Sequence, residues 1–237
     1  MKKLFIMKAG STFSSTHASF GDFEDWIREG LGTVPFPVEV IDVRNMGVLP
    51  SPADCLGVIV TGSHAMVTDN LPWSIALERW IPGLVEAAVP FLGICYGHQL
   101  LGRATGGEVG YHPLGRELGT VEIRLEHAGI DEPLFLNIPG TFMAHSAHSQ
   151  SVLRLPPGAV LLASGHYEPY HSFRIGKAAW GVQFHPEYSA DIMRADICEG
   201  EKDSPAVQHG VSEVSETPFA ARVLANFADY VSSDRDE

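Results

Sequence analysis

Short apolar runs alternate with amphipathic segments over the first 95 residues of the chain. The apolar runs are rich in Val, Ile and Leu without strict two-residue alternation, a pattern typical of strands buried on both faces. The segments between them have helical spacing, and Pro82 in the longest one predicts a kink or a break. This succession predicts βαβ units and a parallel sheet. Strands are expected at 4–9, 38–44, 56–62 and 90–95, and helices at 23–32 and 73–89.

The middle third of the chain has a different pattern. Strand-like runs joined by turn residues follow one another with little helical spacing between them, which predicts antiparallel β structure. The chain then returns through one more apolar strand and ends its regular pattern with a helix. The expected antiparallel strands are 117–126, 141–147, 159–165 and 171–176, the returning strand is 178–184 and the last helix is 218–231.

Together these elements predict an α/β fold in a single domain over residues 1–237. It has three layers, with a mostly parallel central sheet flanked by helices and an additional antiparallel β segment. An acidic stretch with few apolar residues, 191–216, precedes the last helix. We expect this stretch to be an insertion that forms a solvated, mobile helix or loop.

Composition and charge narrow the possible function classes. The 237 residues carry a formal net charge of −13, which argues against nucleic acid as a partner because phosphate-backbone binding needs clustered Lys and Arg. No apolar run approaches the roughly 20 residues that a membrane helix needs, and the N-terminus lacks a signal-peptide pattern. We therefore expect a cytoplasmic protein. The three cysteines contain no C-x-x-C pair of the kind that holds zinc or forms a redox dithiol.

One cysteine occupies a special position. Cys95 lies in the sequence GICYG, residues 93–97, where an apolar strand passes directly into a helix predicted to end at Gly106 and Gly107. A strained strand-to-helix turn of this kind projects a nucleophile above the sheet, and the helix N-terminus favours a thiolate. We interpret Cys95 as a reactive thiol and the other two cysteines, Cys55 and Cys198, as small core residues.

A cysteine nucleophile needs a base, and the base needs an orienting group. The best candidate among 11 histidines is His185, which follows the strand at 178–184 and therefore lies at the carboxyl edge of the sheet. Glu187 follows two residues later, so both side chains can lie on one side of an extended backbone. We expect His185 to take the thiol proton and Glu187 to fix its tautomer.

Three blocks of the sequence resemble the class I glutamine amidotransferase domain, the triad type, and in particular the amidotransferase part of GMP synthase. The resemblance spans most of the chain, and the second and third blocks are highly specific as a pair. It implies a flavodoxin-like amidotransferase architecture without a cofactor. The blocks are VTGSHAMV at 60–67, FLGICYGHQLLGRATGGEV at 91–109 and GVQFHPEYS at 181–189.

The resemblance implies glutamine hydrolysis through a γ-glutamyl thioester and assigns a role to each matching residue. Cys95, His185 and Glu187 match the catalytic residues. Backbone N–H groups of Gly62 and Tyr96 match the oxyanion donors. The residues that match substrate-holding positions are Gln99, His148, Ser149 and Gln150.

Several features depart from the family pattern or need another reading. Many relatives have Gly-Gly-Pro where this chain has Thr-Gly-Ser at 61–63, which puts the shape of that loop in doubt. The N-terminal loop at 9–23 is longer than such a domain needs, and we expect it to cover the site. Arg116 and Glu117 match a segment to which we give a structural role. Four histidines, at 145, 148, 166 and 171, have no metal-ligand spacing, so we predict no metal site.

Three functions remain open from the sequence. The first is a glutaminase-type amidotransferase that passes ammonia to a separate synthetase subunit or releases it, since the chain has no phosphate-binding loop of its own. The second is a γ-glutamyl hydrolase that cleaves a γ-glutamyl amine or peptide with the same three residues. The third is a regulatory or binding module that kept the fold and lost turnover.

Overall fold

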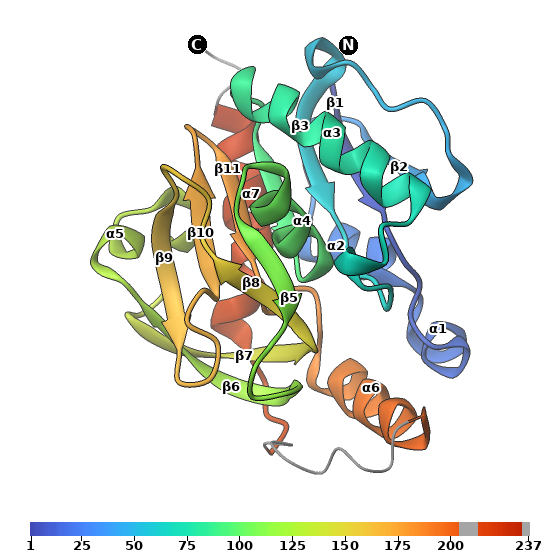
Figure 1. Ribbon diagram of the computed structural model, residues 1–237, viewed down its shortest axis with the longest axis vertical. Coiled ribbons are helices and arrows are strands. Elements are labelled where there is room, and N and C mark those ends of the chain that lie inside the picture. The colour runs from blue at the N-terminus through green and yellow to red at the C-terminus, as the bar shows by residue number, and fades with distance from the viewer. Residues whose placement is uncertain (204–212, 234–237) are drawn as a thin grey trace.

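The fold is built on one large mixed sheet. The computed structural model describes residues 1–203 and 213–233 (Figure 1). Within them, nine strands form a sheet in the order β2-β1-β3-β4-β11-β10-β9-β6-β7. The strands of this sheet are β1 Lys3–Lys8, β2 Val38–Asp42, β3 Cys55–Val60, β4 Phe91–Ile94, β6 Glu117–Leu125, β7 Thr141–His148, β9 Val160–Gly165, β10 Ser172–Ile175 and β11 Ala179–Val182.

The sheet has a parallel half and an antiparallel half. Strands β2, β1, β3, β4 and β11 run parallel to one another, whereas β10 pairs antiparallel with β11 and with β9, and β6 pairs antiparallel with β9 and β7. The predicted antiparallel strands therefore extend the parallel sheet through β11. A separate antiparallel pair, β5 Glu108–Tyr111 with β8 Gln150–Arg154, lies beside the main sheet. The α/β fold with a parallel sheet and added antiparallel structure is confirmed.

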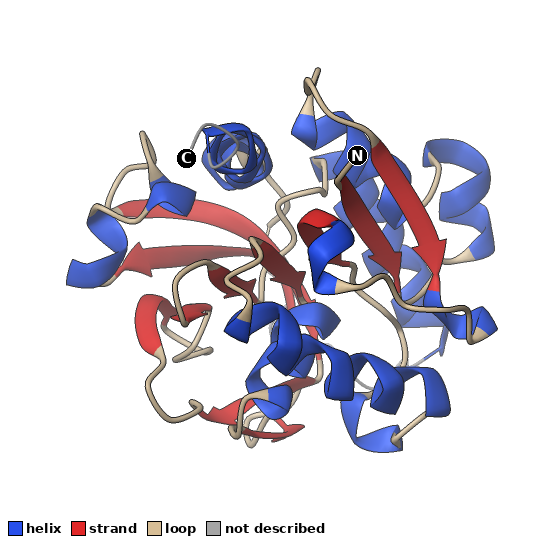
Figure 2. Ribbon diagram, turned by 90° about the horizontal axis from the view of Figure 1, so that it is seen from above, coloured by secondary structure: helices blue, strands red, loops and turns tan. Residues whose placement is uncertain are grey.

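Helices cover both faces of the parallel half, which makes the three layers (Figure 2). In β1, Leu4 and Ile6 pack toward the face covered by α2 and α7, and Phe5 and Met7 pack toward the face covered by α3 and α4. Alternate side chains of one strand thus enter two cores, which explains its continuous apolar run. The longer helices are α2 Phe23–Leu31, α3 Pro72–Glu86, α4 Tyr96–Ala104, α6 Ala190–Asp203 and α7 Pro218–Ser233; shorter ones are α1 Ser14–Phe20, α5 His127–Ile130, η1 Val43–Asn45, η2 Pro52–Asp54, η3 Val67–Asp69 and η4 Pro133–Phe135.

Of the kink or break predicted at Pro82, the break does not occur. Helix α3 continues through Pro82 to Glu86. Pro82 removes one backbone donor, but Leu77, Ile81 and Leu84 are fully buried against the sheet. Their packing holds the helix together across the missing hydrogen bond.

Helix α6 differs from the solvated segment expected at 191–216. Its side chains Ile192, Met193 and Ile197 are buried in a cluster with Trp26 and Tyr188, and Figure 1 shows α6 close to α1. The rest of the predicted insertion includes 204–212, which lie outside the described residues. No helix in the described part of the chain is long and apolar enough to cross a membrane.

Candidate active site

The strand-to-helix turn at Cys95 is strained, as its sequence predicts. Cys95 has φ 49° and ψ −96° between β4 and the first residue of α4. A Cβ at Gly93 would lie 2.3 Å from the carbonyl oxygen of Gly97, and a Cβ at Gly97 would lie 2.5 Å from the carbonyl oxygen of Val60. Both glycines are therefore required for the turn to pack against the sheet.

The returning strand brings His185 to this turn. Val182 at the end of β11 pairs with Ile94 at the end of β4, and the Cys95 N–H donates to the Val182 carbonyl at 2.8 Å. Three residues later, the His185 N–H donates to the carbonyl of His145 at 2.8 Å. The Cys95 thiol and His185 therefore emerge from adjacent parallel strands at the same edge of the sheet.

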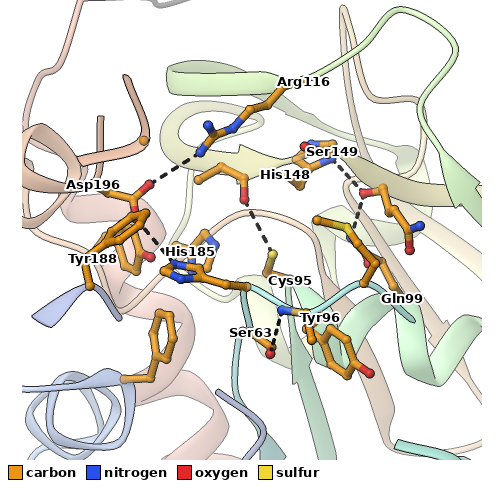
Figure 3. A pocket seen from close by; sticks show the side chains of 18 residues that line it. Ser63, Cys95, Tyr96, Gln99, Arg116, His148, Ser149, His185, Tyr188 and Asp196 are labelled. Carbon is orange, nitrogen blue, oxygen red and sulfur yellow. Dashed lines mark hydrogen bonds and ion pairs between the residues drawn. The ribbon is translucent and has the colours of Figure 1, made fainter. Parts of the chain in front are cut away.

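The side chains of Cys95, His185 and Glu187 form a continuous chain of interactions. The His185 imidazole lines the same pocket as the Cys95 side chain, and their interaction acts to raise the pKa of His185. Nδ1 of His185 lies 2.7 Å from Oε1 of Glu187, and the Cys95 sulfur lies 3.8 Å from the Ala147 carbonyl oxygen. His185 is only 3% exposed, yet it lines the pocket together with Cys95 (Figure 3). This arrangement can shuttle a proton between a sulfur nucleophile and a bound substrate.

Electrostatics favour the charged form of His185. Burial by itself lowers the pKa of this imidazole, but the nearby charges of Glu187 and the Cys95 thiolate outweigh burial and raise the pKa well above 6.5. An imidazolium at this position can stabilise a thiolate and donate a proton to a leaving group.

Aromatic rings hold the His185 imidazole in place. Tyr188 stacks on His185 with ring centroids 4.2 Å apart, and Phe23 stacks farther away at 6.4 Å. Trp26 packs edge-on against Tyr188 at 5.4 Å. Burial raises the pKa of Tyr188 well above 10, so this ring stays neutral and acts as a packing surface. Sequence reasoning missed Tyr188, although it lies three residues after His185.

The pocket extends from the cysteine toward two sets of polar side chains. In Figure 3, Gln99 and Ser149 lie on one side of Cys95, and His185, Tyr188 and Asp196 lie on the other. The pocket is lined by Phe13, Phe23, Ser63, His64, Ala65, Met66, Cys95, Tyr96, Gln99, Arg116, Ala147, His148, Ser149, Gln150, His185, Tyr188, Asp196 and Gly200.

The two expected oxyanion donors, Gly62 and Tyr96, differ in their position relative to the pocket. Tyr96 is the first residue of α4 and lines the pocket, while its hydroxyl donates to Ser74 Oγ at 2.5 Å in the interior. Gly62 is outside the lining, and a Cβ there would lie 3.1 Å from Cε1 of His185. Its neighbour Ser63 lines the pocket instead. The structure therefore brings the Tyr96 backbone to the pocket and places Gly62 against the imidazole.

Gln99 lies one turn into α4 and is fixed by the protein through its amide nitrogen. Nε2 donates to the carbonyl of Gln150 at 2.6 Å and to Oε1 of Gln183 at 3.1 Å. Both N–H groups are thus used, which leaves the Gln99 side-chain oxygen available to a ligand. The Gln99 backbone N–H donates to the Cys95 carbonyl at 3.1 Å, so this side chain is tied to the nucleophile's own helix.

The expected substrate-holding stretch at 148–150 joins β7 to β8. The His148 Nδ1 is 3.0 Å from the Gln150 carbonyl, and the Gln150 side chain donates to Thr68 Oγ1 at 2.6 Å. Both side chains are therefore engaged within the protein. Ser149 is half-buried, lines the pocket, and is the member of this stretch that can offer both its side chain and its backbone to a ligand.

A buried carboxylate supports this stretch from behind. Oε2 of Glu117 accepts from Ser146 Oγ at 2.6 Å and from His148 Nε2 at 3.0 Å, and His171 Nε2 lies 3.5 Å away. Burial acts to raise the pKa of Glu117, but the hydrogen bonds from the two histidines outweigh it and lower the pKa far below 4.5. Glu117 has the structural role predicted for it, whereas its neighbour Arg116 lines the pocket.

The segment at 9–23, expected to be a loop that covers the site, contains helix α1 and the first residue of α2, and it contributes to the pocket. Phe13 and Phe23 line it, and Phe13 lies 4.4 Å from the His64 ring. The loop is anchored by Asp22, whose carboxylate accepts from Lys8 Nζ at 2.7 Å and from the Thr12 N–H at 2.8 Å.

The other cysteines occupy different environments. Cys55 is buried, and burial raises the pKa of its thiol to about 11. Cys198 is exposed on α6, so the expectation that it is a core residue is wrong. Within 1–203 and 213–233, no group of three or more His, Cys, Asp or Glu side chains is arranged to hold a metal ion.

Comparison with known families agrees with this geometry. The family model described as "Glutamine amidotransferase class-I" matches residues 20–201, which is most of the chain. The chain belongs to this family. Among solved structures, a glutamine amidotransferase from Methylobacillus flagellatus superimposes with a TM-score of 0.68 at 24% identity, covering 98% of this chain and 93% of that one. A glutamine amidotransferase from Thermotoga maritima gives 0.69 at 20% identity, covering 99% and 93%.

Curated relatives have two kinds of name. A GMP synthase from Aeropyrum pernix is 35% identical over 153 residues, 61% of this chain and 29% of that protein. Gamma-glutamyl peptidase 3 of Arabidopsis thaliana is 30% identical over 142 residues, 58% of this chain and 56% of that protein. A GMP synthase subunit from Methanococcus vannielii is 28% identical over 185 residues, 76% of this chain and 92% of that protein. The first two matches thus span 29% and 56% of those relatives' lengths.

Proposed function

We propose that this amidotransferase-family protein hydrolyses the side-chain amide of glutamine, or of a γ-glutamyl compound, through a thioester on Cys95. One observation supports this proposal above the others: Cys95 and His185 line the same pocket, and Nδ1 of His185 lies 2.7 Å from Oε1 of Glu187. A strained turn that presents a thiol to a pocket, a charged imidazole that lines the same pocket and a carboxylate behind the imidazole are the parts that acyl transfer needs.

The first half of the reaction forms the thioester. The Cys95 thiolate attacks the γ-carbonyl carbon, and the electron pair of the carbonyl moves to its oxygen. The Tyr96 backbone N–H is positioned at the helix start to stabilise that oxyanion. Collapse of the tetrahedral species breaks the C–N bond while the His185 imidazolium gives its proton to the leaving nitrogen. The released product is ammonia from glutamine, or an amine from a larger γ-glutamyl compound.

The second half returns the enzyme to its starting state. His185, now neutral, takes a proton from water, and the oxygen attacks the thioester carbon. Collapse breaks the C–S bond, releases glutamate and restores the thiolate beside the imidazolium. Glu187 keeps one tautomer of His185 throughout, because its Oε1 accepts from Nδ1.

The glutamyl half of the substrate fits the side of the pocket that contains Gln99 and Ser149. The Gln99 side-chain oxygen can accept from an α-ammonium group, since its nitrogen is already used by Gln150 and Gln183. Ser149 offers its hydroxyl and its backbone N–H to the α-carboxylate, while its carbonyl already accepts from the His112 N–H at 2.9 Å. The tight network from Gln99 to Glu117 supports a fixed receptor of this kind.

A second candidate is a γ-glutamyl hydrolase, which the name of the Arabidopsis relative also suggests. The specific observation in its favour is that the pocket continues beyond His185 to Arg116 and Asp196. Ammonia as a leaving group would not need these side chains, whereas a larger leaving group could contact them. For the first candidate, a separate synthetase subunit would accept ammonia, as the name of the Methanococcus relative suggests. The third reading, a module without turnover, is disfavoured by the complete set of Cys95, His185 and Glu187.

The test is release of ammonia and glutamate from glutamine by the purified chain, alongside covalent labelling by a glutamine-analogue electrophile. We expect Cys95→Ala to lose both turnover and label, and Cys198→Ala, which alters an exposed thiol, to keep both. Turnover by Cys95→Ala would reject the mechanism. Absence of both label and turnover in the wild-type protein, tested with glutamine and γ-glutamyl peptides, would favour the module without turnover.

A further inference from the structure

The pocket wall beyond His185 contains a charged pair that the reaction itself does not use. Arg116, in the loop between β5 and β6, and Asp196, on α6, both line the pocket. Arg116 NH2 lies 3.9 Å from Asp196 Oδ2, and His64 Nε2 lies 4.0 Å from Asp196 Oδ1. Both distances are too long for hydrogen bonds. Burial lowers the pKa of His64, so the attraction between charges is that of Arg116 and Asp196, and it leaves the guanidinium donors and the carboxylate acceptors unused.

The Arg116 guanidinium is held in place by close packing against α6. A Cβ at Gly200 would lie 3.1 Å from Arg116 NH1 and 3.4 Å from NH2, so the guanidinium packs closely against the backbone of α6. Within the described residues, the Arg116 side chain makes no hydrogen bond, and its side chain is 24% exposed. A positioned guanidinium with free N–H groups that faces a pocket matches the two oxygens of a carboxylate.

Asp196 is also unusual for a carboxylate. Its side chain is 4% exposed, and no donor in the described part of the chain lies within hydrogen-bonding distance of it. Burial raises the pKa of Asp196 despite the nearby charges of His185, His64 and Arg116. Asp196 lines the pocket, and its position 3.9 Å from Arg116 lets it orient the guanidinium while leaving the N–H groups of Arg116 to a ligand.

The position of Arg116 and Asp196 relative to His185 shows which part of the substrate they face. His185 must reach the leaving nitrogen to protonate it, so the leaving group lies on the His185 side of Cys95. Asp196 lies on that side as well, while Gln99 and Ser149 lie on the opposite side (Figure 3). Arg116 projects toward Asp196 at the top of the pocket in this view. The charged pair therefore faces the leaving group and not the glutamyl half.

From this geometry we infer that Arg116, oriented by Asp196 and supported by Gly200, binds the carboxylate of the leaving group, so that the preferred substrates are γ-glutamyl amino acids or short γ-glutamyl peptides. The inference rests on the proposed thioester mechanism and selects one substrate class within it. Hydrolysis then consumes one water and yields glutamate and a free amino acid or peptide, whose nitrogen takes the His185 proton.

Three γ-glutamyl compounds test this inference: γ-glutamylglycine, γ-glutamylglycinamide, which lacks the carboxylate, and glutamine. We expect wild-type kcat/KM to be highest for γ-glutamylglycine. Arg116→Gln should reduce kcat/KM for γ-glutamylglycine about 10- to 100-fold more than for γ-glutamylglycinamide, because it removes a charge-assisted contact. Asp196→Asn should reduce the same preference by a smaller factor. Arg154→Gln, which alters an arginine with a 61% exposed side chain, should keep the wild-type preference.

A second measurement covers variants that fold poorly or turn over slowly. Binding of γ-glutamylglycine and γ-glutamylglycinamide to Cys95→Ala, with and without Arg116→Gln, should show the carboxylate preference only when Arg116 is present. Equal losses of kcat/KM for all three compounds in Arg116→Gln would mean that Arg116 serves the glutamyl half. No preference of the wild type for γ-glutamylglycine over γ-glutamylglycinamide would mean that the pair binds no carboxylate. Either result overturns the inference while Cys95-dependent hydrolysis stands. Absence of Cys95-dependent hydrolysis of every compound would instead reject the proposed function.

Discussion

Nδ1 of His185 and Oε1 of Glu187 lie 2.7 Å apart, with a single proline between the two residues in the chain. Both side chains are buried, and Oε2 of Glu187 has no donor among the residues that the structure describes. The charge of Glu187 is therefore directed at the imidazole, where it raises the pKa of His185 against the effect of burial. Because only one residue separates them, the segment that follows β11 positions both side chains together.

Glu187→Gln should therefore change the pH dependence of activity. Without the carboxylate charge, the pKa of His185 falls, so the imidazolium that protonates the leaving nitrogen is lost at lower pH. We expect the alkaline limb of the kcat/KM profile to move to lower pH and the maximum to fall on the order of 10²-fold. Glu39→Gln, at an exposed ion pair, is the control, and an unmoved alkaline limb in Glu187→Gln would contradict the assigned role.

The raised pKa of His185 also predicts how stability depends on pH. Folding favours the protonated form, so this contribution is complete below pH 6.5, the ordinary value, and is lost as the pH rises through the folded value. Urea unfolding of wild type and Glu187→Gln at pH 6 and at alkaline pH measures it. The difference in unfolding free energy between the two proteins should shrink at the higher pH. If the difference in unfolding free energy stayed the same at both pH values, the raised pKa of His185 would not be the source of this stability.

The strained turn predicts a contrast between two glycine substitutions. Gly93→Ala places a methyl group 2.3 Å from a backbone oxygen, and we expect it to destabilise the protein by about 3 kcal/mol or more. Gly83→Ala lies inside α3, where no atom of another described segment lies within 4 Å of the new Cβ, and should stabilise by about 0.5–1 kcal/mol. Urea denaturation compares them, and equal effects would argue against a tightly packed turn.

The Glu117 carboxylate should be important for both stability and substrate affinity. Glu117→Gln removes the charge that pairs with His148 while keeping the shape, and we expect it to cost about 3 kcal/mol and to raise KM more than it lowers kcat. Because folding favours the ionised form, wild type should lose this stability as the pH falls below 4.5. Glu108→Gln, at a pair with a 62% exposed glutamate, should change stability by less than about 0.5 kcal/mol. A pH-independent difference between wild type and Glu117→Gln would contradict the ionised state.

Asp22→Asn should loosen the N-terminal loop over the pocket. Burial acts to raise the pKa of Asp22, but hydrogen bonds from Lys8 and from the N–H groups of Thr12 and Phe23 outweigh it and lower the pKa. We expect a loss of about 1–2 kcal/mol, faster proteolysis within residues 10–22 and a higher KM. The exposed Asp131 provides the control as Asp131→Asn. Unchanged proteolysis in Asp22→Asn would show that the anchor lies elsewhere.

Most of the fold could be predicted because its strands are buried on both faces. The continuous apolar runs of β1, β3 and β4 identified the parallel half, and the glycines around Cys95 identified the turn, since both follow from local sequence. The joining of the antiparallel strands to β11 could not be predicted, because strand order depends on pairings between segments distant in sequence. The helix through Pro82 depends on tertiary packing that a propensity argument does not contain.

The site was predictable on one side of Cys95 and not on the other. Gln99 and the 148–150 stretch carry family motifs, whereas Asp196 lies in a segment whose acidic composition suggested solvent. Its pattern does contain a signal: Met193, Ile197 and Gly200 recur at spacings of four and three, which marks a buried helical face. Gly62 and Ser63 could not be distinguished, because which of two adjacent residues meets a pocket depends on the loop geometry.

Strand β11 joins the parallel half of the sheet to the antiparallel half, and we expect the reactive centre to assemble late in folding. This strand inserts between β4 and β10, and a parallel partner so distant in sequence is slow to find. Until β11 is in place, the sulfur has no imidazole beside it. The rate of Cys95 alkylation, sampled during refolding, would therefore report when β11 pairs with β4 and the two halves of the sheet are joined.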